Sequence, residues 1–201
     1  MHLVKNTWIP EDQYFSEIFS RVDVFDLKSL RGGLRFVSRF NLCIDGGAHV
    51  GSWSRYLSFL FKVVLAFEPE PENYECLIRN VPENVGIYNS ALGPKMGFAS
   101  LLPGINSGCF HIHEGSSTKV VTIDSFNLES LDYLKLDVEG FEWAALKGGE
   151  ESIKRFKPVV QIEEKKLRHY YKSPQTAREF LEELGYKEVL KINNDVVFVW
   201  G

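Results

Sequence analysis

The chain has 201 residues, with 23 Lys and Arg against 27 Asp and Glu and a formal net charge of -4. This length suits one domain with a full hydrophobic core and is too short for two such domains. Because the charge balance is acidic, the chain lacks the positive field that holds a polyanion, and we expect no nucleic-acid partner.

The sequence also indicates where in the cell the protein is located. No stretch reaches the roughly 18 apolar residues of a membrane span, and Glu11, Asp12 and Glu17 stand where a signal peptide would be apolar. We therefore expect a cytoplasmic protein. The cysteines Cys43, Cys76 and Cys109 are far apart and odd in number, which favours reduced thiols.

The first 40 residues are predicted to be a helical extension of the single domain. Apolar residues at helical spacing after Pro10 predict a helix over 10–22. Residues 23–40 continue this pattern, but Gly32-Gly33 interrupts it and suggests two short helical pieces. The remaining residues, 41–201, are then the core of the domain.

Strands and helices alternate through most of this core. Continuous apolar strands separated by helices predict a parallel sheet covered by helices on both faces. The last two strands flank Asn193-Asn194, which indicates a hairpin and an antiparallel final strand. We expect strands at 42–45, 63–67, 85–89, 133–137, 158–163, 186–192 and 195–200. Helices are expected at 51–61 and 140–147, with further helices that begin at 71, end at 156 and begin at 174.

Two segments lie outside this alternation. Residues 92–122 are rich in turn residues and bracket short strands at 97–102 and 118–123, so they form an insertion. The insertion, the segment 167–172 and the N-terminal helices are placed to roof a cleft at the sheet edge.

The loop after the first core strand is the strongest functional feature. A strand, a glycine turn and a helix place bare backbone where ligands bind in open α/β sheets. The spacing is Asp45-x-Gly47-x-x-x-Gly51, which fails the Gly-x-Gly-x-x-Gly pattern of dinucleotide folds. At the end of the next strand, Glu68 can accept two hydrogen bonds from a ribose diol, which suits NAD and S-adenosylmethionine equally.

Five motifs in order resemble the FkbM-type methyltransferases. They are residues 44–51 (IDGGAHVG), 67–69 (FEP), 90–93 (SALG), 121–124 (VTID) and 134–140 (LKLDVEG). The resemblance implies a Rossmann-like class I methyltransferase fold with a mostly parallel seven-stranded sheet and an antiparallel last strand. It also implies S-adenosylmethionine as cofactor and usually a hydroxyl as methyl acceptor.

The resemblance also implies roles for individual residues. Glu68 would hold the ribose hydroxyls of the cofactor, and Ser90 and Ala91 would lie by the adenine. His49 stands where the family commonly has Asn. The loop residues that would hold the methionine and ribose portion are Asp45, Gly46, Gly47, Ala48, His49 and Gly51.

Three carboxylates are candidates for the chemistry. A hydroxyl acceptor must lose a proton near the transition state, so a base or a metal is expected. Asp137 ends the fourth core strand beside the first, and is the first choice for a group facing the reacting centre. Glu139 could share a metal with Asp137 or cap the following helix, and Glu163, which ends the fifth strand, is either catalytic or merely solvated.

Other polar residues have weaker cases. Cys109, His111 and His113 alternate and would share one face of a strand, but no fourth metal ligand is evident. Asp124 is expected to be structural, opening a helical turn with Ser125.

The sequence thus predicts an S-adenosylmethionine-dependent O-methyltransferase acting on a small molecule or a glycan. A NAD-dependent oxidoreductase and a non-catalytic cofactor-binding module of the same fold are the alternatives. Metal dependence and oligomeric state are left open.

Overall fold

The computed structural model describes residues 1–103, 107–108, 110–164 and 173–201. Its centre is a seven-stranded sheet, in which β12 is antiparallel to both of its neighbours and the other pairings are parallel. This confirms the predicted mostly parallel sheet with its terminal hairpin. In spatial order the strands are β11 (Tyr186–Ile192), β12 (Asp195–Trp200), β10 (Val159–Glu163), β9 (Tyr133–Leu136), β3 (Leu42–Gly46), β4 (Val63–Phe67) and β5 (Val85–Tyr88).

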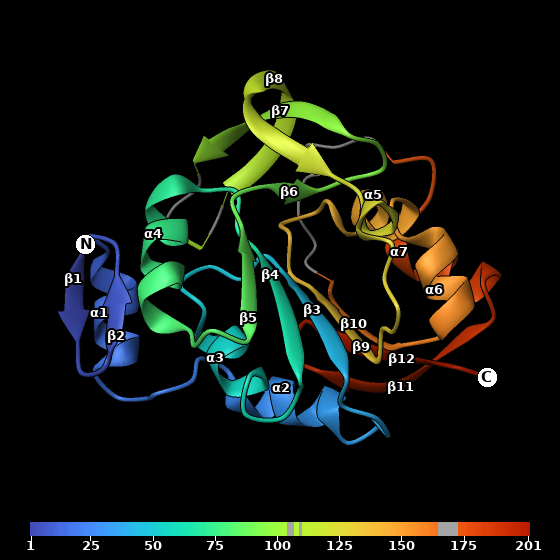
Figure 1. Cartoon of the computed structure of the whole chain (residues 1–201), viewed down its shortest axis with the longest axis horizontal. Coiled ribbons are helices and arrows are strands. Elements are labelled where there is room, and N and C mark those ends of the chain that lie inside the picture. The colour runs from blue at the N-terminus through green and yellow to red at the C-terminus, as the bar shows by residue number, and fades with distance from the viewer. Residues whose placement is uncertain (104–106, 109, 165–172) are drawn as a thin grey trace.

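Helices cover both faces of this sheet (Figure 1). One face packs against α2 (Leu27–Leu34), α3 (Ser52–Leu57) and α4 (Pro71–Asn80). The other packs against α5 (Glu142–Lys147), α6 (Glu150–Phe156) and α7 (Ala177–Glu183), with the 3₁₀ turn η1 (Ile123–Phe126) beside α6.

Local sequence explains where several helices begin. Pro71 opens α4, where its missing N–H costs nothing, and the Glu70 side chain accepts from the Asn73 N–H. A capping box of Thr176 and Glu179 opens α7. Asp124 is structural, as expected, since it accepts from the Glu151 and Ser152 N–H groups at the start of α6. It does not open the turn with Ser125, because Thr122 caps that turn.

The N-terminal extension differs from the prediction. It begins with a hairpin of β1 (His2–Val4) and β2 (Thr7–Ile9), and the helix expected over 10–22 is only α1 (Gln13–Phe19). The Asn80 side chain holds the hairpin against α4, because it accepts from the Trp8 N–H and donates to the Trp8 carbonyl. The extension is therefore not wholly helical.

The prediction of two helical pieces broken at Gly32-Gly33 is also wrong, since both glycines lie within α2. A Cβ on Gly32 would be 2.5 Å from the Ile192 side chain, and one on Gly33 would be 2.1 Å from the Gln161 side chain. The glycines let α2 lie directly on the sheet rather than ending it.

The insertion forms a separate three-stranded sheet at the top of Figure 1. Its strands are β6 (Ala91–Leu92), β8 (Phe110–Val121) and β7 (Gly97–Pro103). β7 agrees with the strand expected at 97–102, β8 begins before the strand expected at 118–123, and β6 was not expected. Of the cysteines, Cys43 and Cys76 are free and buried, as expected, and Cys109 lies outside the described residues. In the described part of the chain, no helix is long and apolar enough to cross a membrane.

Candidate active site

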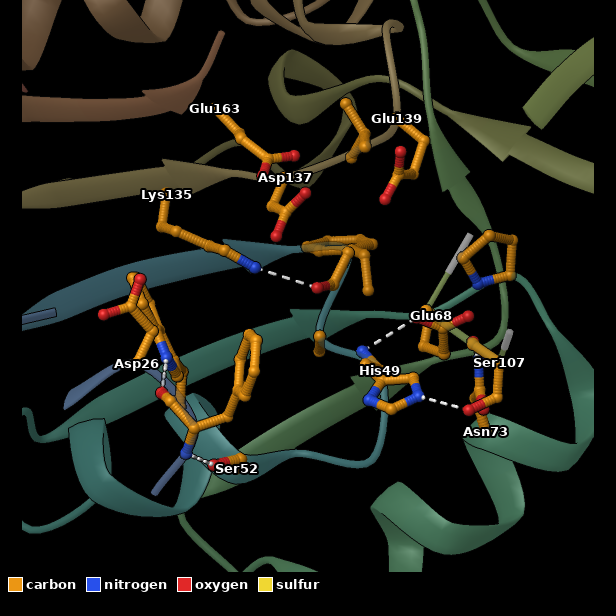
Figure 2. Close-up of a pocket in the computed structure, with 18 of the residues that line it drawn as sticks. Asp26, His49, Ser52, Glu68, Asn73, Ser107, Lys135, Asp137, Glu139 and Glu163 are labelled. Atoms are coloured by element: carbon orange, nitrogen blue, oxygen red, sulfur yellow. Dashed lines mark hydrogen bonds between the residues drawn. The ribbon is translucent and has the colours of Figure 1, made fainter. Parts of the chain in front are cut away.

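A cavity of about 400 Å³ opens at the carboxyl ends of the parallel strands. One part, here called the cofactor half, is lined by the loop after β3, the end of β4 and the segment Ser90–Leu92. The other part, the acidic half, is lined by Asp137, Glu139, Glu163 and Asp195. Figure 2 shows residues of both halves facing one space.

The glycine loop needs its glycines. Gly47 has φ of 73°, and a Cβ there would lie 1.8 Å from the Asp137 carbonyl oxygen. Gly51 has φ of 84°, and its Cβ would lie 2.5 Å from the Leu77 side chain. Only a residue without a side chain fits both the backbone and the space. The N–H groups of Gly47 and Ala48 donate to the Phe67 carbonyl, which holds the loop against β4.

Asp45 lies under this loop and is not among the cavity-lining residues. Its carboxylate is fully buried, accepts from the Ser54 hydroxyl at 2.6 Å and is 3.0 Å from the Lys135 ammonium. Lys135 also donates to the Gly47 carbonyl at 2.8 Å. The sequence predicts a carboxylate aimed at the cofactor, whereas the structure places it in an ion pair that supports the loop.

Lys135 was not anticipated from sequence, although a lysine in the apolar run of β9 was a usable indication. Its side chain lines the cavity. Burial opposes the charge, but Asp45 and Asp137 outweigh it and raise the pKa of Lys135 above its usual value. The ammonium of Lys135 therefore stays charged at physiological pH.

Glu68 lies where the sequence predicts, at the end of β4 in the cofactor half. One carboxylate oxygen accepts from the His49 N–H at 2.8 Å and the other from the Glu70 N–H at 2.9 Å. Burial raises the pKa of Glu68 to about 7, although these hydrogen bonds favour the charged form. Each oxygen can still accept a further hydrogen bond from a ligand.

His49 joins the loop to two other segments. Its φ is 52°, its ring centroid is 4.4 Å from that of Phe15, and Nε2 is hydrogen-bonded to the Ser107 hydroxyl at 3.0 Å. Burial lowers the pKa of His49 to about 4, against the opposite influence of the nearby carboxylates, so the imidazole is neutral at physiological pH. Phe15 and Ser107 also line the cavity. They were not named as site residues, although the N-terminal helices and the insertion were expected to roof the cleft.

Ser90 and Ala91 are buried and line the cofactor half beside Glu68, and Gly46 ends β3 below the loop.

The acidic half brings together the three predicted carboxylates. One carboxylate oxygen from each of Asp137, Glu139 and Glu163 lies within 4.8 Å of the others. Such oxygens suit a hard divalent cation and can equally act as bases. The N–H groups of the turn, at Val138 and Gly140, donate to Glu142. Burial raises the pKa of Glu142 to about 7.

Asp195, at the start of β12, also lines the acidic half and was not anticipated. It accepts from the Gln161 side chain at 2.7 Å, and burial raises its pKa. The candidate ligands His111 and His113 lie in β8, but their side chains, like Cys109 and residues 165–172, lie outside what the structure describes.

The strand order, the glycine loop after β3 and the acidic residue Glu68 at the end of β4 together define the class I methyltransferase fold. Residues 45–188 match the family model described as the methyltransferase FkbM domain. The chain belongs to the FkbM methyltransferase family.

Solved structures agree with this fold. An FkbM methyltransferase from Methylobacillus flagellatus has a TM-score of 0.57 at 17% identity over 89% of this chain, which spans 56% of that protein. A precorrin 8W decarboxylase from Methanobacterium thermoautotrophicum has a TM-score of 0.57 at 12% identity, covering 99% of this chain and 98% of its own.

A proposed tRNA (m1A22) methyltransferase from Streptococcus pneumoniae has a TM-score of 0.50 at 13% identity, covering 88% of this chain and 71% of its own. At these identities the likeness shows the fold alone, and the expected absence of a nucleic-acid partner stays a prediction. No curated protein matches the sequence.

Proposed function

We propose that this protein uses S-adenosylmethionine to methylate a hydroxyl group on a small molecule or a glycan. The observation that carries the proposal is the single cavity in which Glu68 and the glycine loop lie beside Asp137, Glu139 and Glu163. The cofactor half offers hydrogen-bond acceptors for a ribose diol, and the acidic half offers carboxylates that can take the proton of the acceptor hydroxyl.

The residues of the chain fit such a cofactor. Glu68 would accept from the ribose hydroxyls, while Gly47, Ala48 and His49 would line the space for the methionine portion. Gly46 and Gly51 do not line the cavity and would act by shaping the loop. Ser90 and Ala91 would flank the adenine. Asp45 would act through Lys135 by fixing the loop, since it does not line the cavity.

When bound, the cofactor supplies an electrophilic methyl group on a sulfonium. The cavity would have to hold the acceptor hydroxyl against that methyl group, and such positioning is worth effective molarities of roughly 10⁵–10⁸ M in favourable cases. The carboxylate of Asp137 would accept the proton that the acceptor hydroxyl loses. Glu139 and Glu163 are the next candidates for this role.

The acidic net charge favours an acceptor other than nucleic acid. The formal net charge of -4 provides no general attraction for phosphates. Only Lys135 contributes an ammonium among the described cavity-lining residues, and it is paired with Asp45.

Transfer of a labelled methyl group from S-adenosylmethionine to a panel of glycans and hydroxylated small molecules tests the proposal. We expect label in at least one hydroxyl-bearing acceptor. Label confined to protein side chains or to tRNA would contradict the proposed acceptor class. Parallel titration with NAD should show no binding, which distinguishes the proposal from an oxidoreductase. A bound cofactor without transfer to any acceptor would favour the non-catalytic alternative.

A further inference from the structure

Asn73 lines the cofactor half of the cavity, and its side-chain oxygen is a buried hydrogen-bond acceptor. Asn73 lies in the first turn of α4, is 1% exposed and lines the cavity. Its Nδ2 donates to the Ser107 carbonyl at 2.6 Å. Its Oδ1 is buried and has no hydrogen-bond partner within residues 1–103, 107–108, 110–164 and 173–201.

The orientation of this amide is fixed by its surroundings. Exchanging the oxygen and nitrogen would set two oxygens against each other, so the Ser107 carbonyl assigns Nδ2 to its observed position. Ser107 itself is held because its N–H donates to the Asp12 carboxylate at 2.7 Å. Oδ1 is therefore a buried acceptor that donors of the described residues leave unsatisfied, a state that is unfavourable until a donor reaches it.

The neighbour of Asn73 is the residue that the ribose is expected to contact. Figure 2 draws Asn73, Ser107 and Glu68 together beside His49. The Asn73 side chain is close enough to Glu68 for its hydrogen bonding to favour the charged carboxylate, which lowers the pKa of Glu68 against the larger effect of burial. Each Glu68 oxygen already accepts one backbone N–H. A hydroxyl donor that enters between these two side chains would find an acceptor on each of them.

We propose that Asn73 Oδ1 accepts a hydrogen bond from a ribose hydroxyl of the adenosyl cofactor, so that Asn73 and Glu68 together bind the diol. The proposal rests on the proposed function and adds a second residue to its cofactor site. Ser107 is then a positioning residue, since its carbonyl orients the Asn73 amide. The pair would discriminate a ribose from a deoxyribose more strongly than Glu68 alone.

Calorimetric titration with S-adenosylhomocysteine and with its 2′-deoxy and 3′-deoxy analogues tests the proposal. We expect the native protein to bind at least one deoxy analogue more weakly than the parent compound. In Asn73→Ala that difference should shrink by about three- to tenfold, the size of one net hydrogen bond. Asn73→Ser provides a second variant, and thermal unfolding checks that both variants fold.

Asn80→Ala is the matched control. It removes a buried amide from the same helix outside the cavity, so it should keep the native difference in affinity between the three compounds. Equal discrimination in the native protein and in Asn73→Ala would overturn the proposal while leaving the proposed function intact. A native protein that binds both deoxy analogues as tightly as the parent overturns it without any variant. No binding of S-adenosylhomocysteine at all would overturn the proposed function, and this proposal with it.

Discussion

Lys135 and Asp45 form a buried ion pair between neighbouring strands, with Nζ 3.0 Å from Oδ1 and side chains 7% and 0% exposed. The same ammonium donates to the Gly47 carbonyl, so the pair connects β9, β3 and the glycine loop. The loop is therefore held from beneath by a charge pair and from the side by the Phe67 carbonyl.

Replacing Lys135 by Met should destabilise the protein, because Asp45 would keep a buried charge without its cation. Breaking one partner of a buried pair costs about 3–5 kcal/mol, which urea unfolding measures. The double variant Lys135→Met with Asp45→Asn removes both charges and should recover much of this loss. An unfolding free energy of Lys135→Met equal to the native value would contradict the structural role of the pair.

Gly47→Ala should lose cofactor binding and stability together. The new Cβ would lie 1.8 Å from the Asp137 carbonyl oxygen at a φ of 73°, so the loop must move. We expect a loss of more than about 1 kcal/mol in thermal unfolding. Gly97→Ala is the matched control, because its Cβ would meet nothing within 4 Å. Equal melting temperatures and cofactor affinities for the two variants would show that the close approach is unimportant.

Asp137→Asn should reduce methyl transfer while sparing cofactor affinity. General-base catalysis typically contributes 10²–10⁴-fold, so a fall in kcat of about that size is expected once an acceptor is known. Asp23→Asn, an exposed carboxylate outside the cavity, should leave the rate unchanged. Weaker binding of S-adenosylhomocysteine to Asp137→Asn would place the residue in the cofactor site instead.

A chelator separates the two chemical roles of the acidic half. If Asp137 acts as a base, treatment with EDTA should leave transfer by the native protein unchanged. If EDTA abolishes transfer and Mg²⁺ restores it, then Asp137, Glu139 and Glu163 hold a metal rather than supply a base.

Cofactor affinity should depend on pH through Glu68. Burial raises its pKa to about 7, so the free protein holds the carboxyl protonated below that pH, where it is a poorer acceptor for ribose hydroxyls. The affinity for S-adenosylhomocysteine should therefore rise between about pH 6 and 8. Because the folded pKa lies above the ordinary value of 4.5, folding is favoured by protonation, and this contribution is lost as pH rises toward 7.

In Glu68→Gln, the affinity for S-adenosylhomocysteine measured by calorimetry should not change between about pH 6 and 8. Glu142→Gln is the control, since burial also raises the pKa of Glu142 to about 7, yet it does not line the cavity. A profile that flattens in Glu142→Gln but not in Glu68→Gln would refute the assignment.

Local patterns predicted most of the fold. Apolar runs between helices identify the parallel strands, and Asn193, at a φ of 53°, indeed opens the hairpin of β11 and β12. The hairpin of β1 and β2 could not be predicted in this way. Its turn places Lys5 at a φ of 51°, and lysine is not a residue that signals a turn.

The sequence predicted those site residues that directly follow a strand. It missed the residues that reach the site from distant segments of the chain. Glu68 and Asp137 follow their strands, so their position at the sheet edge follows from topology. Ser107 reaches His49 across 58 residues, and the burial of Asp45 depends on Lys135, 90 positions later in the numbering, which no local pattern reports.

The most direct test is calorimetric titration of the native protein and of Glu68→Ala with S-adenosylhomocysteine. The proposed function predicts one binding site per chain and an affinity at least about tenfold weaker in the variant, because up to two charge-assisted hydrogen bonds are lost. Absence of binding by the native protein, or an unchanged affinity in Glu68→Ala, would contradict it.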